Sequence, residues 1–484
     1  MPKQLMLVEV LTETTEAFAL HAVAVASMKE SETQLEKLAA GIGGAGVDID
    51  PEYPPLPMFA HARGGAHAVA GGLRAFSSPT TNKDLAATST VLTAEIDSEK
   101  IAALRKKKNV RLYPASRLHL MTGCQCGGGQ SRAPEPDRSP DLEMDEFSIF
   151  DIAPTAGGID CRPFRPGVSV TTIRRVLGVR RPFEDGFAGQ NVIVGVVDEG
   201  INGLTYPVIG GYEPLPSSME LRFGEADIGS HGSMCAADIL VAAPRAKLLD
   251  YPLLSEATSA DGAQMFQLIL ERRRLDGTPQ VVNNSYGFVG IPSREDFPTH
   301  EVWDIDHPFN RKVREVAASG ASVFFAAGNC GSDCPSGNCR SSGIGPGRSI
   351  NAAASMIDVF TIAAVNSRNE RVGYSAQGPS NNAPGFVVEK PDFASYTHFF
   401  GNFGPGRPGG TAQSFDNGTS AATPVASGVA ALLISAFPTL TPERLRKALL
   451  AGAIEVGAAG WDPLHGHGII NAGASYQRLR SGEV

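Results

Sequence analysis

The chain of 484 residues has neither an excess of positive charge nor an unbroken apolar run long enough to span a bilayer. Lys and Arg total 42 against 51 Asp and Glu, so the formal net charge at pH 7 is −9. A strongly basic surface for nucleic acid is therefore not expected. A membrane helix needs about 20 consecutive apolar residues, and no such run occurs. We expect neither nucleic acid nor a membrane as a partner.

Cysteines are also scarce. The sequence has seven, an odd number that does not describe a disulfide framework. Cys330, Cys334 and Cys339 fall within ten residues. They could form a local disulfide, a redox switch or part of a metal site. If the protein is exported, we expect a Cys334–Cys339 bond. Cys124 and Cys126, beside a run of glycines, are more typical of exposed thiols than of a metal site.

The N-terminus lacks the features of a secretory leader. Signal peptides begin with basic residues that are followed by an apolar stretch. Here Glu9, Glu13 and Glu16 precede the apolar residues 17–28. We therefore expect no signal peptide and favour a cytoplasmic over a secreted location.

The remaining composition is typical of a globular protein with more than one domain. Apolar residues make up 42% of the chain and charged residues 19%. At about 150 residues per domain, the length predicts two to four domains with ample core. Gly and Pro number 54 and 34, which predicts many turns and long loops.

The first third of the chain predicts a small domain and a linker. Residues 1–121 predict an α+β domain, with a loop at 41–79 where Gly, Ala and Pro are frequent. Residues 122–169 are rich in Gly, Pro and acidic residues, as linkers are. The predicted elements of the small domain are strands at 5–11, 90–96 and 110–113 and helices at 32–40 and from Ser98.

Residues 170–484 predict an α/β domain. Short apolar runs alternate with helix-like stretches, and unbroken apolar strands are typical of a parallel sheet covered on both faces. In such sheets the functional site lies beyond the carboxyl ends of the strands. The apolar runs are residues 192–197, 247–251, 280–282, 323–327 and 360–365.

Four polar residues follow these runs or begin a helix. Asp198 follows the first run, His231 opens a stretch of small residues, and Asn329 follows Gly328 after a later run. Ser420 precedes an apolar helix. Taken singly, each is more typical of a cap, a turn or a structural residue. Taken together, they are the groups of nucleophilic catalysis, in which a base activates a serine hydroxyl and an acid orients the base.

The order Asp198, His231, Ser420 is that of subtilisin, and residues 170–484 resemble the subtilisin-like serine peptidases. The matching segments are VIVGVVDEGI, SHGSMCAADI, VVNNSYG, FFAAGN, NGTSAATPVASGVAALL and GHGIINA. The resemblance implies a subtilisin-like three-layer fold with a parallel sheet. It also implies a serine endopeptidase that acts on protein or peptide substrates.

The resemblance further implies a role for each matching residue. Asp198 would be the acid, His231 the base and Ser420 the nucleophile, with Asn329 as the oxyanion donor. No catalytic metal and no cofactor are implied. Many relatives carry a calcium loop after the histidine helix, but residues 232–244 are too few to form one. The implied substrate-binding residues are Ser285, Tyr286, Gly287, Ala327 and Gly328.

The N-terminal domain resembles the inhibitory propeptide of the family. The resemblance rests on its strand–helix–strand pattern and on its place before the catalytic domain. It implies a zymogen whose own N-terminal domain is an intramolecular inhibitor. We expect the first cut between Leu120 and Phe147.

Three residues depart from the family pattern. Glu199 follows the triad Asp where a small hydroxyl residue is commoner, Met234 replaces a second His, and Asp238 lies where small residues are usual. Glu199 could perturb the titration of the site or face solvent. Because the triad is complete, an active zymogen peptidase is the main hypothesis. The alternatives are a peptide-maturation protease or transpeptidase acting on a dedicated precursor, and an inactive binding module.

Overall fold

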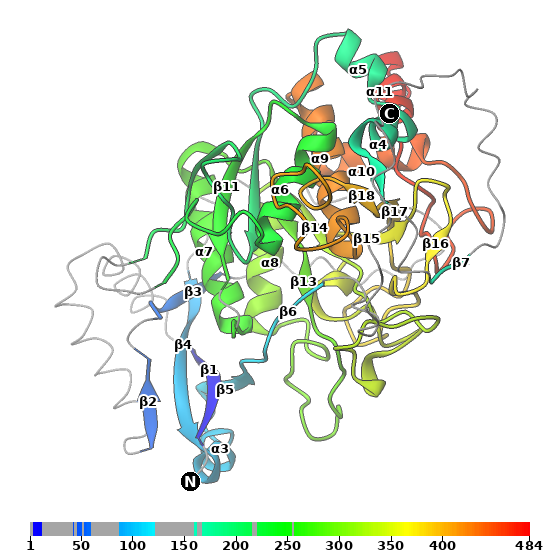
Figure 1. The fold of residues 1–484 in the computed structure, drawn as a ribbon. Coiled ribbons are helices and arrows are strands. Elements are labelled where there is room, and N and C mark those ends of the chain that lie inside the picture. The colour runs from blue at the N-terminus through cyan, green and yellow to red at the C-terminus, as the bar shows by residue number, and fades with distance from the viewer. Residues whose placement is uncertain are drawn as a thin grey trace.

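The computed structural model describes residues 3–11, 42, 46–50, 53–59, 87–121, 159–161, 167–214, 220–253 and 256–484. A small sheet domain precedes a large α/β domain in these residues (Figure 1). The helix predicted at 32–40 and the pair Cys124 and Cys126 lie outside them.

The N-terminal domain is an antiparallel sheet with one short helix. The strand order is β2-β4-β1-β5, and β3 pairs with β4. The prediction of a loop at 41–79 is wrong for two segments, which form β2 and β3. These strands are too short to show an alternation of apolar and polar residues, and they are held by pairing with β4. The elements are β1 Lys3–Leu11, β2 Val47–Ile49, β3 Leu56–Phe59, β4 Ala87–Asp97, α3 Ser98–Leu104 and β5 Val110–Pro114.

Strand β1 contributes side chains to two hydrophobic cores. Met6 and Val8 belong to a cluster with Ile101 of α3 inside the small domain. Leu7 belongs to a cluster with Phe309 of the large domain. Because successive side chains of a strand point to opposite faces, this one strand packs against both domains.

The large domain is built on a nine-stranded, mostly parallel sheet. The strand order is β10-β11-β9-β12-β14-β15-β16-β7, with β17 also paired to β15. Only the β15–β16 pair of this sheet is antiparallel in the described chain. The bounds are β7 Ile159–Asp160, β9 Ile193–Asp198, β10 Val208–Gly211, β11 Lys247–Pro252, β12 Val281–Asn284, β14 Ser322–Ala326, β15 Phe360–Val365, β16 Arg371–Val372 and β17 Phe393–Tyr396.

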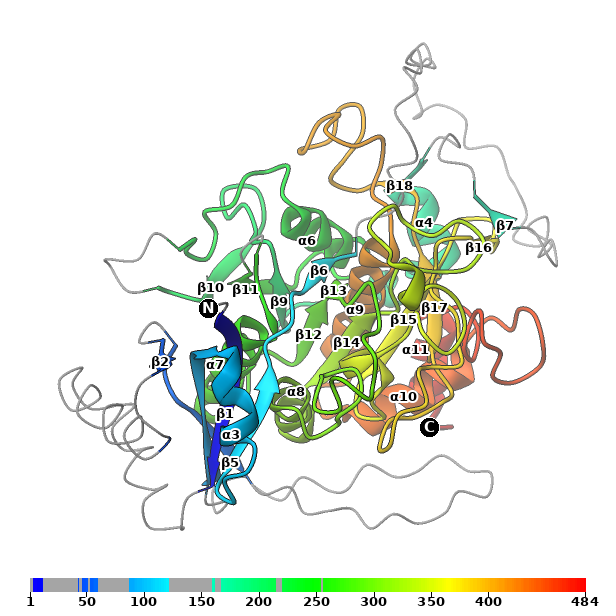
Figure 2. The same cartoon turned by 90° about the horizontal axis from the view of Figure 1, so that it is seen from below.

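Helices cover both faces of this sheet and make three layers (Figures 1 and 2). Helices α6 and α9 belong to one core, and α7 and α8 to the other, which also receives side chains of the small domain. The helices are α4 Val170–Leu177, α5 Arg180–Glu184, α6 His231–Ala242, α7 Ser259–Asp276, α8 Pro308–Ala318, α9 Thr419–Ala436, α10 Pro442–Gly452 and α11 Ala472–Ser481.

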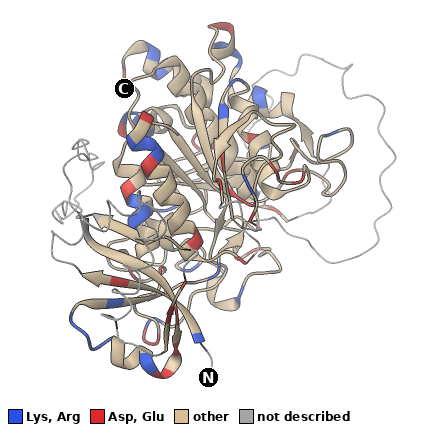
Figure 3. Cartoon of the chain, turned by 90° about the vertical axis from the view of Figure 1, so that its left-hand side faces the viewer, with Lys and Arg blue, Asp and Glu red and all other residues tan. Residues whose placement is uncertain are grey.

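The most apolar helix lies in the middle of the domain. Helix α9 is long and apolar enough to cross a membrane, but 89% of it is buried inside the fold, as in a core helix. Figure 3 shows Lys and Arg interspersed with Asp and Glu along helices, strands and loops of the chain. The loop between α6 and β11 consists of residues 243–246.

Two pieces of the predicted linker pair with the large domain. Strand β7 pairs with β16. Strand β8, Val168–Ser169, pairs with β18, Phe399–Phe400. Cys161 follows β7 directly and forms a disulfide with Cys334.

The disulfide expected between Cys334 and Cys339 is wrong, because Cys339 is bonded to Cys330. Turns closed through Ser336 bring Cys339 back beside Cys330. Cys334 N instead donates to the carbonyl of Gly373, which holds Cys334 at the end of β16. The pairing depends on this loop path and not on spacing in the sequence.

Candidate active site

Asp198 and His231 meet where β9 ends and α6 begins. Asp198 Oδ1 lies 2.6 Å from His231 Nδ1 and also accepts the Glu199 amide at 2.8 Å. Both side chains are buried. Burial disfavours the charged imidazole, but the charge and hydrogen bond of Asp198 and the charges of Glu199 and Asp416 together outweigh it, so the pKa of His231 is raised.

Glu199 contacts the same histidine. Its Oε2 accepts the backbone N–H of His231 at 2.8 Å, at the N-terminus of α6. A carboxylate at this end of a helix satisfies a free amide and complements the helix dipole. The charge of Glu199 also contributes to the raised pKa of His231. Glu199 therefore helps to place and charge the imidazole.

Ser420 is the second residue of α9, after a turn at Gly418 whose φ of +84° suits glycine. The side chain is buried, and its Oγ donates to the carbonyl oxygen of Met121 at 2.5 Å. His231 Nε2 is buried and has no hydrogen-bond partner within the described residues. The hydroxyl is thus bonded to the tail of the N-terminal domain and not to the imidazole.

Asn329 contacts the same carbonyl from the end of β14. Its Nδ2 donates to Met121 O at 2.5 Å. Its Oδ1 accepts from both the amide and the hydroxyl of Thr419, at 2.9 Å each. The Met121 carbonyl oxygen therefore accepts from both Ser420 Oγ and Asn329 Nδ2.

The tail of the N-terminal domain runs along the predicted substrate segment (Figure 2). Strand β6, His119–Leu120, pairs antiparallel with β13, Tyr286–Gly287. Met121 N donates to Ser285 O at 2.9 Å. The Met121 side chain is buried, and its Cε lies where a side chain at Gly287 would begin. The tail thus contacts Ser285, Tyr286 and Gly287 mainly through backbone groups.

The other predicted substrate contacts have structural partners. The Tyr286 hydroxyl donates to Asn284 Oδ1 inside a hydrophobic core. Ala327 N donates to the neighbouring strand β15 at Ile362 O. Gly328 N donates to Thr419 Oγ1 at 3.2 Å. Ala327 and Gly328 therefore connect β14 to Asn329, and their amides bond to β15 and to Thr419 and not to the tail.

Cys235 is a neighbour that the sequence analysis missed. One helical turn after His231, its Sγ lies 3.5 Å from Asp198 Oδ2. The four-residue spacing on a predicted helix is the signal that could have found it. Burial raises the pKa of this thiol well above its usual range. Asp198, His231 and Cys235 place potential metal-ligating atoms within 4.8 Å of one another, although the Asp198–His231 hydrogen bond already uses two of them.

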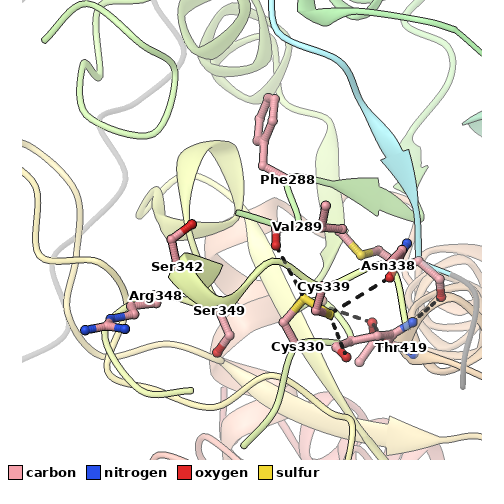
Figure 4. The surroundings of a disulfide bond; sticks show 12 residues. Phe288, Val289, Cys330, Asn338, Cys339, Ser342, Arg348, Ser349 and Thr419 are labelled. Atoms are coloured by element: carbon pink, nitrogen blue, oxygen red, sulfur yellow. Dashed lines mark hydrogen bonds between the residues drawn. A yellow bond between two sulfur atoms is a disulfide. The ribbon is translucent and has the colours of Figure 1, made fainter. Parts of the chain in front are cut away.

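A disulfide borders the loop that begins at Asn329. Figure 4 shows the Cys330–Cys339 bond close to Thr419. Cys339 Sγ lies 3.4 Å from the carbonyl oxygen of Asn329. The Cys330 side chain is buried and faces the Val289 carbonyl. The bond therefore closes this loop next to the site.

Comparison with known proteins gives one consistent result. The model of the subtilase family matches residues 189–468. Fervidolysin of Fervidobacterium pennivorans is 27% identical over 325 residues, which cover 62% of this chain and 43% of fervidolysin. Subtilisin E of Bacillus subtilis (strain 168) is 28% identical over 303 residues, which cover 60% of this chain and 67% of that protein.

A solved structure is similar in fold. The crystal structure of fervidolysin matches 98% of this chain and 61% of its own, with a TM-score of 0.55 and 18% identity. At this identity the likeness concerns the fold alone. The sequence match also spans less than half of the length of fervidolysin.

Proposed function

Because the chain belongs to the subtilase family, the subtilisin-like serine peptidases, we propose that it is a serine endopeptidase made as a self-processing zymogen. Asp198, His231 and Ser420 are its triad, and Asn329 is the oxyanion donor. The observation that carries the proposal is the Met121 carbonyl oxygen, which accepts from both Ser420 Oγ and Asn329 Nδ2. The substrates are protein or peptide chains.

The proposed chemistry gives each residue of the site one role. Ser420 attacks the substrate carbonyl carbon while His231 Nε2 takes the hydroxyl proton. Asp198, bonded to Nδ1, keeps the imidazole in the right tautomer and stabilises its charged form. Asn329 Nδ2 and the amides at the start of α9 stabilise the developing oxyanion. His231 then protonates the leaving amine, and water releases the acyl group by the same steps.

The N-terminal domain inhibits this site by lying in it as a substrate does. Its tail pairs with β13, and its last described carbonyl faces the nucleophile. The bond after Met121 is therefore the processing bond. Contacts away from the site hold the domain after the cut, among them Glu9 with Arg311, Tyr53 with Asp261 at 2.6 Å, and His307 with the Pro114 carbonyl at 2.9 Å.

The same contacts indicate which peptide bonds are cut. The Met121 side chain is buried beside Gly287, where a side chain would collide with it. A long, unbranched apolar side chain fits this place. We infer cleavage after apolar residues such as methionine.

The two disulfides bear on location. Disulfides persist in oxidising compartments and are rare in the cytosol. Cys161–Cys334 and Cys330–Cys339 therefore favour an exported enzyme over the cytoplasmic location expected from the N-terminus.

A fluorophosphonate probe and a peptide substrate test the activity together. The processed protein should react with the probe at Ser420 and hydrolyse peptides after apolar residues. Ser420→Ala should do neither while keeping the same melting temperature. A wild-type protein that is folded but unlabelled would support the inactive binding module instead. Ligated products in mass spectra would support the transpeptidase.

A further inference from the structure

A tyrosine supports the turn that carries the nucleophile. The backbone N–H of Gly418, two residues before Ser420, donates to Tyr374 Oη at 2.7 Å. Gly418 is the N-cap residue of α9 and has no side chain with which to cap the helix. Tyr374 is buried, and burial raises the pKa of its hydroxyl, so the hydroxyl keeps its proton. That proton must be donated elsewhere.

The acceptor of this proton is a histidine. Tyr374 Oη lies 2.8 Å from His398 Nε2. Because the tyrosine oxygen already accepts from Gly418, its hydrogen points to Nε2, and the imidazole proton is then on Nδ1. His398 is nine-tenths buried. Its backbone φ of +64° places it in the left-handed region, which is unusual for histidine.

The far side of this histidine faces a carboxylate. His398 Nδ1 lies 3.7 Å from Asp160 Oδ2 and has no hydrogen-bond partner in the described part of the chain. The same Asp160 oxygen accepts from Asn366 Nδ2 at 3.0 Å. Asp160, His398 and Tyr374 thus form an acid–imidazole–hydroxyl series that ends at Gly418. The series has the same order of groups as the proposed triad, but its hydroxyl bonds to the backbone N–H of Gly418.

Asp160 belongs to the segment predicted as a linker, and this segment is fastened beside Tyr374. Asp160 pairs with Val372 across the β7–β16 pair, and its carbonyl accepts the Gly373 N–H at 3.0 Å. The next residue, Cys161, is bonded to Cys334. A side chain at Gly373 would collide with both sulfur atoms, so the packing around the disulfide is close.

We propose that Asp160, His398 and Tyr374 are positioning residues that hold the nucleophile turn, and that residues 159–161 are consequently a working part of the mature catalytic domain. The proposal rests on the proposed peptidase function. A cut after Met121 leaves the segment in the chain. A second cut between 161 and 167 would still leave it attached through the Cys161–Cys334 disulfide.

Tyr374→Phe tests the hydrogen bond between Tyr374 and Gly418, because the substitution removes only the hydroxyl. The processed variant should lose roughly 10-fold to 100-fold in kcat with KM nearly unchanged, since misplacing a reacting group slows chemistry more than binding. Tyr396→Phe is the matched control, because the buried Tyr396 hydroxyl donates to Asn369 Oδ1 and not to Gly418. That control should keep kcat. Equal kcat in Tyr374→Phe and wild type, or a change in KM alone, would overturn the proposal.

His398 variants provide a test that does not depend on Tyr374→Phe folding. A Gln side chain can place its oxygen where Nε2 lies and accept the Tyr374 hydroxyl, whereas Asn is too short to do so. His398→Gln should keep most of kcat. His398→Asn should lose it while still folding, because Asn suits the φ of +64° better than His does. Similar kcat values in the two variants would contradict the positioning role.

Asp160→Asn completes the series. The variant should lower kcat by less than Tyr374→Phe, since it acts one group further from the turn, and unchanged kcat would remove Asp160 and its segment from the proposal. Labelling of Ser420 by the fluorophosphonate probe separates the two proposals. If the wild type is neither labelled nor active, the peptidase function itself fails. If it is labelled and active but the variants match it, only the positioning role fails.

Discussion

Thr419 fixes the orientation of the Asn329 side-chain amide. Its backbone N–H and its hydroxyl both donate to Asn329 Oδ1, at 2.9 Å each. Two donors can be accepted only by the amide oxygen, so the amide nitrogen must face the Met121 carbonyl. The residue directly before Ser420, the proposed nucleophile, therefore orients Asn329, the proposed oxyanion donor.

Thr419→Val should weaken this alignment at nearly constant volume. The variant keeps the backbone donor but loses the hydroxyl, so the amide of Asn329 gains freedom and kcat should fall about tenfold. Asn329→Ala should cost more, about 10²–10³-fold in kcat, which is the loss that removing an asparagine oxyanion donor causes in subtilisin. Steady-state kinetics measure both. A rise in KM without loss of kcat in either variant would make Asn329 a substrate-positioning residue.

Asp250 should make stability depend on pH. Burial raises the pKa of this carboxyl to about 7, against the lowering effect of its hydrogen bonds from Gly224 and Ile201. Because this pKa is higher in the folded state than in the unfolded chain, protonation of Asp250 stabilises the fold. This contribution is complete near pH 4 and is lost as pH rises through about 7. The loss is about 4 kcal/mol.

Asp250→Asn removes this titration and keeps an oxygen for both backbone donors. The melting temperature of wild type should fall relative to that of Asp250→Asn between pH 5 and pH 8. Asp296→Asn, at an exposed position, is the matched control and should follow wild type. Parallel curves for wild type and Asp250→Asn would show that Asp250 is already ionised at pH 5.

Glu9 should strengthen the hold of the N-terminal domain. Its Oε1 lies 2.5 Å from Arg311 Nη1 of α8, and both side chains are buried. Burial alone would raise the pKa of Glu9, but the charge of Arg311 and the hydrogen bonds from Ser89, Arg311 and Tyr113 together lower it below its usual value. Glu9→Gln leaves Arg311 buried without its charge partner, which costs about 2–5 kcal/mol in comparable interfaces.

The processed complex provides the measurement for Glu9. When each processed complex is diluted, activity appears as the N-terminal domain dissociates. For Glu9→Gln this should occur at a protein concentration at least tenfold higher than for wild type. Glu95→Gln is the control, because Glu95 lies exposed on the same sheet. Identical dilution curves for Glu9→Gln and wild type would mean that the tail in the active site provides all of the inhibition.

The Cys330–Cys339 disulfide should support both stability and turnover. It closes a short loop that begins beside Asn329. Replacing both cysteines with Ala should lower the free energy of unfolding by about 2–3 kcal/mol. It should lower kcat more than it raises KM, because Asn329 directly precedes the freed loop. A destabilised variant with unchanged kcat would show that the disulfide has no part in the site.

Much of the site could be predicted from the sequence because it follows strands and opens helices. Asp198, His231 and Ser420 lie in segments that can be recognised from a few consecutive residues, by their apolar pattern and their small side chains. Their order then identified the family. The role of Glu199 could not be decided from the sequence, because its partner, the His231 amide, lies 32 residues away.

The remaining features could not be predicted because they depend on tertiary contacts. The Cys161–Cys334 bond joins segments separated by 173 residues. Asp160, His398 and Tyr374 come from three separate segments. Strands β2 and β3 are too short for an alternating pattern. The position of Met121 against Ser420 requires the docking of a whole domain.

Intact mass and N-terminal sequencing of freshly expressed protein test the central claim most directly. Wild type should separate into residues 1–121 and a chain beginning at Thr122, because the Met121 carbonyl is bonded to both Ser420 and Asn329. Ser420→Ala should remain a single chain of 484 residues. An uncut wild type that is nevertheless active, or the same cut in Ser420→Ala, would contradict self-processing at this bond.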